Sequence, residues 1–395
     1  MNMKTRGLKG YGITAVLLLL LLVSIKPTTV AAGSARSCRV PETHPTIQTA
    51  VDDPSCDKVV LAAGTYAENV MVTRSVRVVG SGNLESIIDG TSSGTVVTIA
   101  SELDVRLKNL VVQHGRNQLG GGIYNDSSKL RLTSVVLSNN MAVPGPAGLG
   151  EGGGLYNDGG QVVIKASALT GNSATPRGGG IYNTGKLTLN NTFLSNGGVI
   201  GGGFYNTASG TVTIRNSSFS ASGGQVGNHF YNDGGVVKSR STLYADANAA
   251  VGSIQNTTGA QFTSNGDTFS NNHSSSGPGG AIINSGTMKL RNCLFEDNSA
   301  SLFGGAFISS SVGSVNIKKC TFANNTATLD GGAIFNSGEL FMARTAVVDN
   351  TAGGNGGGIA SEGTLTLKRT VTFFGNQATD FDNVWNTGSC SGCPS

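Results

Sequence analysis

Apolar and polar residues alternate in short runs along most of this chain. Between 116 and 377, runs such as LRLTS (130–134) and LTLKR (365–369) alternate with period two. This alternation predicts half-buried β-strands, and the density of Gly, Asn and β-branched residues disfavours helices. A second kind of segment ends in F-x-x-N, as in FEDN (295–298) and FANN (322–325).

A glycine-rich phrase recurs between these strands at intervals of about 25 residues. Its clearest copies are GGGIYN (120–125), GGGLYN (152–157), GGGIYN (178–183), GGGFYN (201–206), GGAIIN (279–284) and GGAIFN (331–336). A fixed period of this length is the signature of a solenoid. Three short strands and three turns per period predict an all-β fold, a parallel β-helix of roughly 12–13 coils.

The first 32 residues have the pattern of a secretory signal peptide. Lys4, Arg6 and Lys9 precede an apolar stretch over 13–23, and small residues follow at 30–32. The apolar stretch is too short to span a bilayer, so we expect cleavage, a secreted or cell-surface protein and no transmembrane anchor.

The remaining chain divides into three parts. Residues 33–115 are expected to form an N-terminal cap and entry coils, residues 116–377 the repeat β-helix, and residues 378–395 a C-terminal closing tail outside the repeat.

Charge gives no reason to expect a nucleic-acid partner. The chain has 27 basic and 23 acidic residues, and four of the basic residues lie within 1–32, which contains no acid. The rest of the chain is therefore neutral overall.

Two resemblances sharpen the fold. The stretches PTIQTAVD (45–52) and VVLAAGTYAENVMV (59–72) are similar to the entry coils of the pectin-lyase-like group, which implies a right-handed β-helix with a short cap helix over 47–51. The pairing of GG-[AG]-[ILF] with F-x-x-N resembles the repeats of chlamydial polymorphic outer membrane proteins. That resemblance implies a passenger-like, surface-exposed β-helix, and nothing after 376 matches the membrane barrel of the autotransporters among them.

Equivalent positions in successive coils should stack as columns. The glycines are expected to form tight corners, and the Asn that ends each phrase an inward hydrogen-bonded ladder. The Tyr before each Asn should then face outward, where it could stabilise the coils by stacking or form a platform for sugar rings. These candidate binding residues are Tyr124, Tyr156, Tyr182, Tyr205 and Tyr231.

A basic column follows the inward apolar residue of several strands. It comprises Lys165, Arg215, Arg291, Lys318 and Lys368. It could attract acidic polysaccharide, but solvent-side filling that prevents edge pairing is the favoured explanation.

Catalysis on this fold would need clustered carboxylates with a basic residue. The candidates are Asp126, Asp158 and Asp233, which follow the phrase in matching positions, but Thr184 and Thr207 interrupt the column. No lyase, pectinesterase or polygalacturonase motif matches. If the protein is an enzyme, the fold favours a polysaccharide lyase or a glycoside hydrolase.

No metal or cofactor is predicted. Stacked aspartates could bind Ca²⁺, yet calcium repeat motifs are absent, and the histidines at 44, 114, 229 and 273 are scattered. The expected function is therefore adhesion or surface display by a monomeric, non-catalytic β-helix that contacts extracellular polysaccharide or a cell-surface ligand. The alternatives are a carbohydrate-binding or polysaccharide-degrading protein and a purely structural stalk.

Six cysteines fit an exported protein. Cys38 and Cys56 flank the expected cap helix and predict a disulfide, and Cys390 and Cys393 predict a second one in the tail. Cys293 and Cys320 share a column, so they could form either a disulfide or an unbonded thiol pair.

Overall fold

The computed structural model describes residues 36–146, 148–220, 224–368 and 370–394. The described residues lie within one compact unit, Ala35–Ser395. The predicted signal peptide, 1–32, lies outside the described residues.

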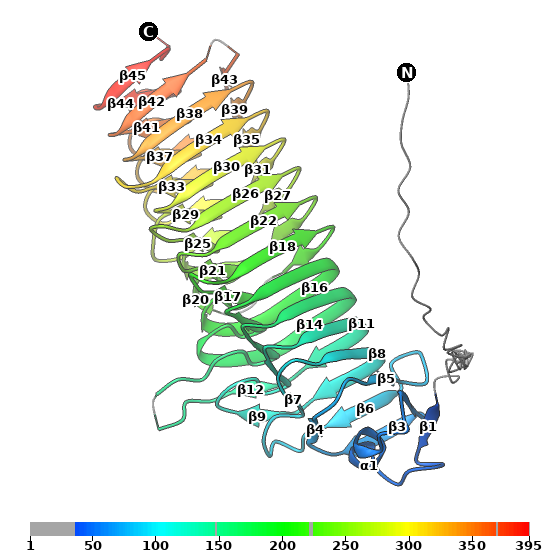
Figure 1. The fold of residues 1–395 in the computed structure, drawn as a ribbon. Helices are drawn as coiled ribbons and strands as arrows, with labels where there is room; N and C mark the ends of the chain where they lie inside the picture. The colour runs from blue at the N-terminus through cyan, green and yellow to red at the C-terminus, as the bar shows by residue number, and fades with distance from the viewer. Residues whose placement is uncertain (1–35, 147, 221–223, 369, 395) are drawn as a thin grey trace, which may run out of the picture. The chain divides into compact units, whose positions relative to one another are not determined.

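The described chain is a right-handed parallel β-helix, as predicted (Figure 1). Every strand pairs in parallel with its counterpart in the neighbouring coil. The pairing produces one sheet of 32 strands, which continues around the corners of the coils, and a second sheet of 13 strands. One strand of the 13-stranded sheet belongs to each coil, so the coil number is close to the predicted one.

The larger sheet begins each coil with a strand whose outward side chains are mostly polar. These strands are β1 (Ser37–Val40), β2 (Lys58–Leu61), β5 (Arg77–Val79), β8 (Asp104–Gln113), β11 (Lys129–Ser138), β14 (Gln161–Arg177), β16 (Lys186–Ile200), β18 (Thr211–Arg215), β22 (Val236–Arg240), β26 (Gln261–Asn265), β30 (Thr287–Arg291), β34 (Ser314–Lys318), β38 (Glu339–Ala343), β42 (Thr364–Leu367) and β45 (Ser389–Ser391).

Shorter strands continue the same sheet past the next corner, where β8, β11, β14 and β16 run through without a break. They are β3 (Gly64–Ala67), β6 (Ser86–Asp89), β9 (Arg116–Asn117), β12 (Met141–Ala142), β19 (Ser218–Phe219), β20 (Gly224–Val226), β23 (Leu243–Ala245), β24 (Asn248–Val251), β27 (Thr268–Ser270), β28 (His273–Ser274), β31 (Leu294–Glu296), β32 (Ser299–Ala300), β35 (Thr321–Ala323), β36 (Thr326–Ala327), β39 (Ala346–Val348), β40 (Thr351–Ala352) and β43 (Thr372–Phe374).

The glycine phrase leads into the 13-stranded sheet. Its strands are β4 (Val70–Val72), β7 (Val97–Ile99), β10 (Ile123–Asp126), β13 (Leu155–Asp158), β15 (Ile181–Asn183), β17 (Phe204–Asn206), β21 (Phe230–Asn232), β25 (Ile254–Asn256), β29 (Ile282–Asn284), β33 (Phe307–Ser309), β37 (Ile334–Asn336), β41 (Ile359–Ser361) and β44 (Val384–Asn386).

Glycine occupies the corner before most of these strands, and the geometry there explains why. Gly178 has φ +68°, a left-handed conformation that side chains disfavour. A Cβ atom on the next residue, Gly179, would lie 1.9 Å from the carbonyl oxygen of Gly197 in the following coil. The phrase is therefore a corner device, as predicted.

The interior of the coils is a continuous apolar core. In a central coil, Ile123, Leu130, Leu132 and Leu137 are all at most 1% exposed. Toward the C-terminus, phenylalanine rings replace some of the aliphatic side chains and stack from coil to coil. The ring centroids of Phe269 and Phe295, for example, lie 4.3 Å apart.

Two asparagine ladders tie the coils together at the corners. The predicted ladder at the end of the phrase is present: the amide of Asn157 donates to Asn183 Oδ1 at 2.8 Å, and Asn183 donates to Asn206 in the same way. The F-x-x-N asparagines form a second ladder that the sequence analysis did not foresee, as in Asn298 to Asn325 at 2.9 Å.

The cap helix expected over 47–51 is present as α1 (Ile47–Asp52). The carboxylate of Glu68 accepts hydrogen bonds from the backbone N–H groups of Ile47 and Gln48, at 2.9 and 3.0 Å. At the other end of the helix, Arg74 donates to the carbonyl oxygen of Val51 at 2.6 Å. Charged side chains from the first coils thus satisfy both helix ends and hold the cap on the solenoid.

The C-terminal segment does not leave the repeat, which corrects the expectation of a tail outside it. Strand β44 pairs with β41, and β45 pairs with β42. Residues 384–391 therefore add one more coil, because Trp385 and Asn386 take the positions of the phrase's Tyr and Asn.

Candidate functional site

The outward face of the first strand of each coil is lined with basic residues, and we call it the basic face. The strand registers place Arg77, Arg106 and Arg131 in one column, and Arg215 and Arg240 in another. The full set comprises Lys58, Arg77, Arg106, Lys108, Lys129, Arg131, Lys165, Lys186, Arg215, Lys238, Arg240, Lys289, Arg291, Lys318 and Lys368. Most of the positive charge of the coils thus lies on one face, although the chain without 1–32 is neutral overall.

Few carboxylates compensate this charge. Asp104 lies 3.3 Å from Arg106 and 2.9 Å from Arg131, at the N-terminal end of the face. Among the described residues from Lys186 to Lys368, no basic side chain of the face forms an ion pair. Such a surface attracts an extended polyanion by charge alone.

A pocket of about 380 Å³ lies where β30, β34 and β38 end, at the edge of the basic face. Arg291, Lys318, Lys319 and Arg344 line it together with Asn292. The charged groups at its rim are donors that suit carboxylate or sulfate oxygens.

The predicted tyrosine column lies on the outside of the 13-stranded sheet. The rings stack on one another along the solenoid: Tyr156 and Tyr182 have ring centroids 5.0 Å apart and planes 11° apart, and Tyr182 and Tyr205 lie at 5.3 Å and 2°. Tyr124 and Tyr231 extend the stack at its two ends. Because each inner ring has neighbouring rings against its faces, and Tyr182 and Tyr205 are only 7% and 4% exposed, these rings offer a sugar no platform of open faces.

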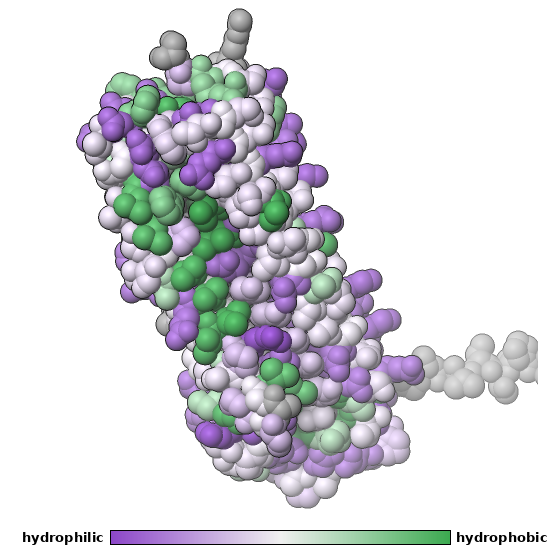
Figure 2. Space-filling view, turned by 90° about the vertical axis from the view of Figure 1, so that its left-hand side faces the viewer, coloured by the Kyte–Doolittle hydropathy of each residue, from purple (hydrophilic) through white to green (hydrophobic). Residues whose placement is uncertain are grey.

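The same outward column becomes apolar toward the C-terminus, where Ile283, Ile308 and Phe335 follow in register. Figure 2 faces this side and shows apolar side chains gathered in a band along the solenoid. Phe335 is 6% exposed and packs on Phe303, with 4.8 Å between the ring centroids.

The candidate catalytic aspartates lie beside the tyrosine column and accept hydrogen bonds from it. Asp126 and Asp158 are register partners in neighbouring coils. The hydroxyl of Tyr124 donates to Asp158 Oδ2 at 3.1 Å, and the hydroxyl of Tyr205 donates to Asp233. Burial, with a further contribution from Asp158, raises the pKa of Tyr124 to about 12, so Tyr124 stays a hydrogen-bond donor at neutral pH.

Catalysis by these aspartates would need a basic residue beside them, but the nearby Arg177 is paired with another carboxylate. Arg177 lies over the ring of Tyr205, with Cζ 5.3 Å from the centroid, and its guanidinium pairs with Glu151 at 3.3 Å. Burial raises the pKa of the Glu151 carboxyl, and Arg177 opposes that shift. The described residues contain no ion pair to Asp126, Asp158 or Asp233. The sequence analysis did not predict the Glu151–Arg177 pair, because Glu151 lies at the end of the inserted loop 141–151 and so has no equivalent position in the other coils.

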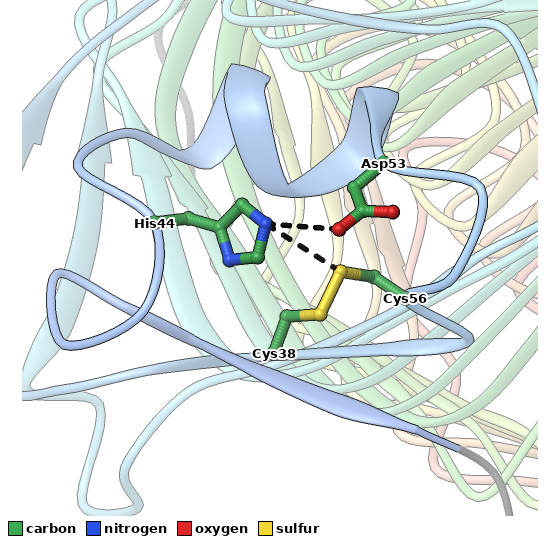
Figure 3. A group of neighbouring side chains, drawn as sticks. All are labelled: Cys38, His44, Asp53 and Cys56. Atoms are coloured by element: carbon green, nitrogen blue, oxygen red, sulfur yellow. Dashed lines mark hydrogen bonds and ion pairs between the residues drawn. A yellow bond between two sulfur atoms is a disulfide. The ribbon is translucent and has the colours of Figure 1, made fainter.

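The cysteines are in two states. Disulfides join Cys38 to Cys56 and Cys390 to Cys393, and Figure 3 shows the first of them beneath the cap helix. Cys293 and Cys320 are buried free thiols, and the backbone N–H of Cys293 donates to Cys320 Sγ at 3.3 Å. Of the two states left open for this column, the structure has the unbonded one.

Within the described parts of the chain, no helix has the length and apolarity to cross a membrane.

One curated relative is the cell surface glycoprotein of Methanothermus fervidus, 28% identical over 128 residues. The match covers 31% of this chain and only 20% of the relative.

Similar solved structures include the catalytic domain of a GH87 α-1,3-glucanase, with TM-score 0.49, 9% identity, and 94% of this chain and 70% of that chain covered. Another is an alginate lyase from Paenibacillus sp. str. FPU-7, with TM-score 0.23, 12% identity, and 87% and 98% covered. Residues 202–378 match the family model described as "Right handed beta helix region". Over this stretch, sequence and structure together identify a right-handed β-helix.

Proposed function

We propose that this protein is an extracellular, non-catalytic β-helix that attaches to acidic polysaccharide through its basic face and so acts in adhesion or display at a cell surface. The observation that carries this proposal is the row of outward basic side chains from Arg215 to Lys368, most of them exposed, with no ion pair among the described residues.

The geometry of the solenoid suits a polymer. Coils repeat at about 4.8 Å, which is close to the rise of one sugar in an extended chain. A polysaccharide with one carboxylate on each sugar, laid along the solenoid axis, would meet cations at coil after coil. Each contact is weak in water, but many contacts along one chain add up to useful affinity.

Two further observations support an extracellular setting. The pattern of 1–32 is that of a signal peptide, and the partial relative is a cell surface glycoprotein. Export makes polysaccharide a better candidate than nucleic acid for the polyanion. The resemblance to polymorphic outer membrane protein repeats stays a prediction.

The test compares binding to polygalacturonate and alginate with binding to a neutral glucan and to single-stranded DNA, with and without Ca²⁺. We expect both acidic glycans to bind, the neutral glucan not to bind, and the affinity to fall as salt screens the charges. Tighter binding to DNA than to either acidic glycan, or equal binding to the neutral glucan, would overturn the proposal.

Charge reversal locates the surface. The triple variant K289E/R291E/K318E should bind alginate at least tenfold more weakly, which corresponds to about 1.4 kcal/mol. The single variants R291E and R116E form a matched pair, because both arginines are exposed and Arg116 lies in β9, away from the basic face. Only R291E should weaken binding.

Polysaccharide cleavage is the second candidate function, and the pairing of Asp126 with Asp158 is the observation that favours it. Ultraviolet absorbance of unsaturated uronides and a reducing-end assay on the same polymers test it. Products that disappear in D126N/D158N would establish an enzyme and replace the non-catalytic proposal.

A further inference from the structure

Two long basic residues, Lys319 and Arg344, occupy a backbone corner that holds asparagine or a small residue in the preceding coils. The corner follows the first strand of a coil and has positive φ, a conformation that glycine and asparagine adopt most readily. Lys319 and Arg344 have φ +58° and +54°. Residues that break a local rule in this way are found most often at functional sites. From β8 to β30 the same corner holds Asn109, Ser134, Ala166, Asn191, Asn216, Ser241, Gly266 and Asn292.

These two side chains line the pocket of about 380 Å³ together with Arg291 and Lys318, which end β30 and β34. The register pairs Arg291 with Lys318 and Lys318 with Ala343, so the four cations lie on three successive coils, over about 10 Å of the solenoid axis. The described lining contains no carboxylate, and none of the four cations forms an ion pair with a described residue. An anionic ligand would relieve the repulsion among them.

Neighbouring side chains hold two lining residues of this pocket in place. Nζ of Lys318 lies 5.5 Å from the ring centroid of Phe341. The side-chain amide of Asn292 donates to Asn265 Oδ1 at 2.8 Å. The pocket is therefore partly ordered before any ligand arrives, which lowers the entropy that binding costs.

A second pocket, of about 450 Å³, adjoins the first along the solenoid. Arg291 and Lys318 line both pockets, and Lys289 and Asn316 line the second one. A charged polymer that occupies the corner pocket can therefore continue into the second pocket and meet a further cation there.

The arrangement of the four cations favours a sulfate ester over a carboxylate. The two oxygens of a carboxylate lie in one plane and suit one guanidinium or two neighbouring cations. A sulfate ester has three terminal oxygens that point in different directions, so it can accept hydrogen bonds from cations on three coils at once. The guanidinium groups of Arg291 and Arg344 present their donors as planar forks that match such oxygens.

We propose that this corner pocket binds the sulfate esters of a sulfated polysaccharide, and that Lys319 and Arg344 distinguish sulfate from carboxylate. This role rests on the proposed function, because the basic face holds the rest of the polymer. The ester is bound intact through charge-assisted hydrogen bonds, so no covalent bond is made or broken. The adjoining pocket takes the next charged group of the polymer.

The test compares polymers of equal charge density in calorimetry. Polygalacturonate has two carboxylates on each pair of sugars, whereas chondroitin 6-sulfate has one carboxylate and one sulfate ester. We expect chondroitin 6-sulfate to bind roughly fivefold more tightly, the gain from about one further charge-assisted hydrogen bond. Chondroitin without sulfate shares its backbone and should bind more weakly than both. Poly(glycerol phosphate), whose phosphate diesters have only two terminal oxygens, should bind more weakly than chondroitin 6-sulfate.

The variant K319N/R344N tests the two corner residues and keeps the corner conformation, because asparagine adopts it at Asn216. This variant should lose the preference, so that chondroitin 6-sulfate and polygalacturonate bind with similar affinities. The matched control K129Q/R215Q removes one lysine and one arginine that are exposed on the basic face outside the pocket. The control should weaken both polymers alike and keep the preference for sulfate. Circular dichroism spectra of both variants should match that of the parent protein.

The outcomes separate the sulfate pocket from the proposed function. Equal affinity of the parent protein for polygalacturonate and chondroitin 6-sulfate would overturn the sulfate pocket alone. Tighter binding of poly(glycerol phosphate) than of chondroitin 6-sulfate would do the same, and so would a folded K319N/R344N variant that keeps the preference for sulfate. A parent protein that binds none of the acidic polymers would overturn both.

Discussion

The ammonium group of Lys318 lies 5.5 Å from the ring centroid of Phe341, one coil further along the basic face. Lys368 approaches the same ring to 5.9 Å. The half-buried ring of Phe341 thus gathers two cations at the point where the face would otherwise carry an uncharged gap between Asn316 and Thr366. A surface that carries both aromatic rings and cations suits an acidic sugar, because the ring can pack against the apolar face of the sugar and the cations can pair with its carboxylate.

Replacing this ring should weaken the proposed glycan binding. In F341A the two lysines lose the cation–π contact that fixes their positions, a contact worth about 0.5–1 kcal/mol at an exposed site. The affinity for alginate should fall roughly two- to fivefold, as measured by calorimetry or retention on an alginate column. F374A is the control, because Phe374 is 74% exposed and belongs to β43, outside the basic face. An equal loss in both variants would point to general stickiness of exposed rings.

Removing the acid on this part of the face should have the opposite effect. Glu339 is the one carboxylate on the outward strand positions from Lys186 to Lys368, and no described residue pairs with it. E339Q should bind alginate about twofold more tightly at low salt, since a single exposed charge contributes little in water. The difference from the parent should vanish at high salt. Weaker binding by E339Q would contradict a purely cationic contact.

The first asparagine ladder should be a major source of stability. Asn183 accepts from Asn157 and donates to Asn206 and to the carbonyl oxygen of Gly185, all within 2.8–3.0 Å. N183A leaves buried polar groups without partners and should lower the free energy of unfolding by about 2–4 kcal/mol. The expected loss for N183S is smaller, because Ser309 and Ser361 occupy the same column in later coils. Denaturant unfolding of the two variants provides the measurement.

Features that follow from the repeat could be predicted from the sequence. The period placed every phrase asparagine in one inward column, and the amide chemistry then required the ladder that contains Asn183. The same alternation placed the tyrosines outward. It could not show that their rings stack face to face, because stacking depends on side-chain rotation and on the close spacing of the coils.

Features that depend on register or on turns could not be predicted. The basic column found in the sequence follows one position of the strands, and the register added a second column that includes Arg106, Lys238 and Lys289. The spacing of the histidines along the chain did not show which polar groups would lie beside His44. The turn before α1 and the capping of the helix bring His44 to Asp53 and Cys56, which lie 9 and 12 residues away.

Attachment of the cap should depend on Arg74. Besides Val51, its guanidinium donates to the carbonyl oxygens of Ala50 and Cys56, at 3.3 and 2.8 Å. R74M removes these bonds and leaves the helix carbonyls unpaired, so it should destabilise the cap by about 2–3 kcal/mol. Hydrogen exchange should then speed up in residues 37–61 and stay unchanged in the central coils. R77M, which alters an exposed residue of the basic face three positions later, should leave exchange in the cap unchanged.

Two buried ionisable groups should give the protein opposing pH dependences. Asp267 is 1% exposed in the core, where it accepts from the backbone N–H of Thr242 and the hydroxyl of Ser264. Burial raises its pKa to about 6. His229 is also buried, donates to Asn272 Oδ1 at 2.9 Å in the column where Ala247 lacks an amide, and has its pKa lowered by burial to about 4.

The signs follow from which state binds more protons. Asp267 keeps its proton longer in the folded state, so its contribution is fully present below its unfolded pKa and is lost as pH rises through about 6. His229 takes up its proton more readily in the unfolded state, so its contribution is lost as pH falls from about 6.5 to about 4. Each shift corresponds to about 3 kcal/mol, so between pH 4 and 6 the two contributions largely cancel in the parent protein.

Single variants should separate them. Relative to the parent, D267N should become more stable as pH rises from 4 to 6, because the parent alone then buries a charge. H229Q keeps an amide donor for Asn272 and should show the opposite trend, with its stability relative to the parent falling over the same range. Chemical unfolding at half-unit pH steps measures both differences. Parallel curves for the parent and both variants would mean that neither group remains buried and shifted, and a double variant should return to the shallow dependence of the parent.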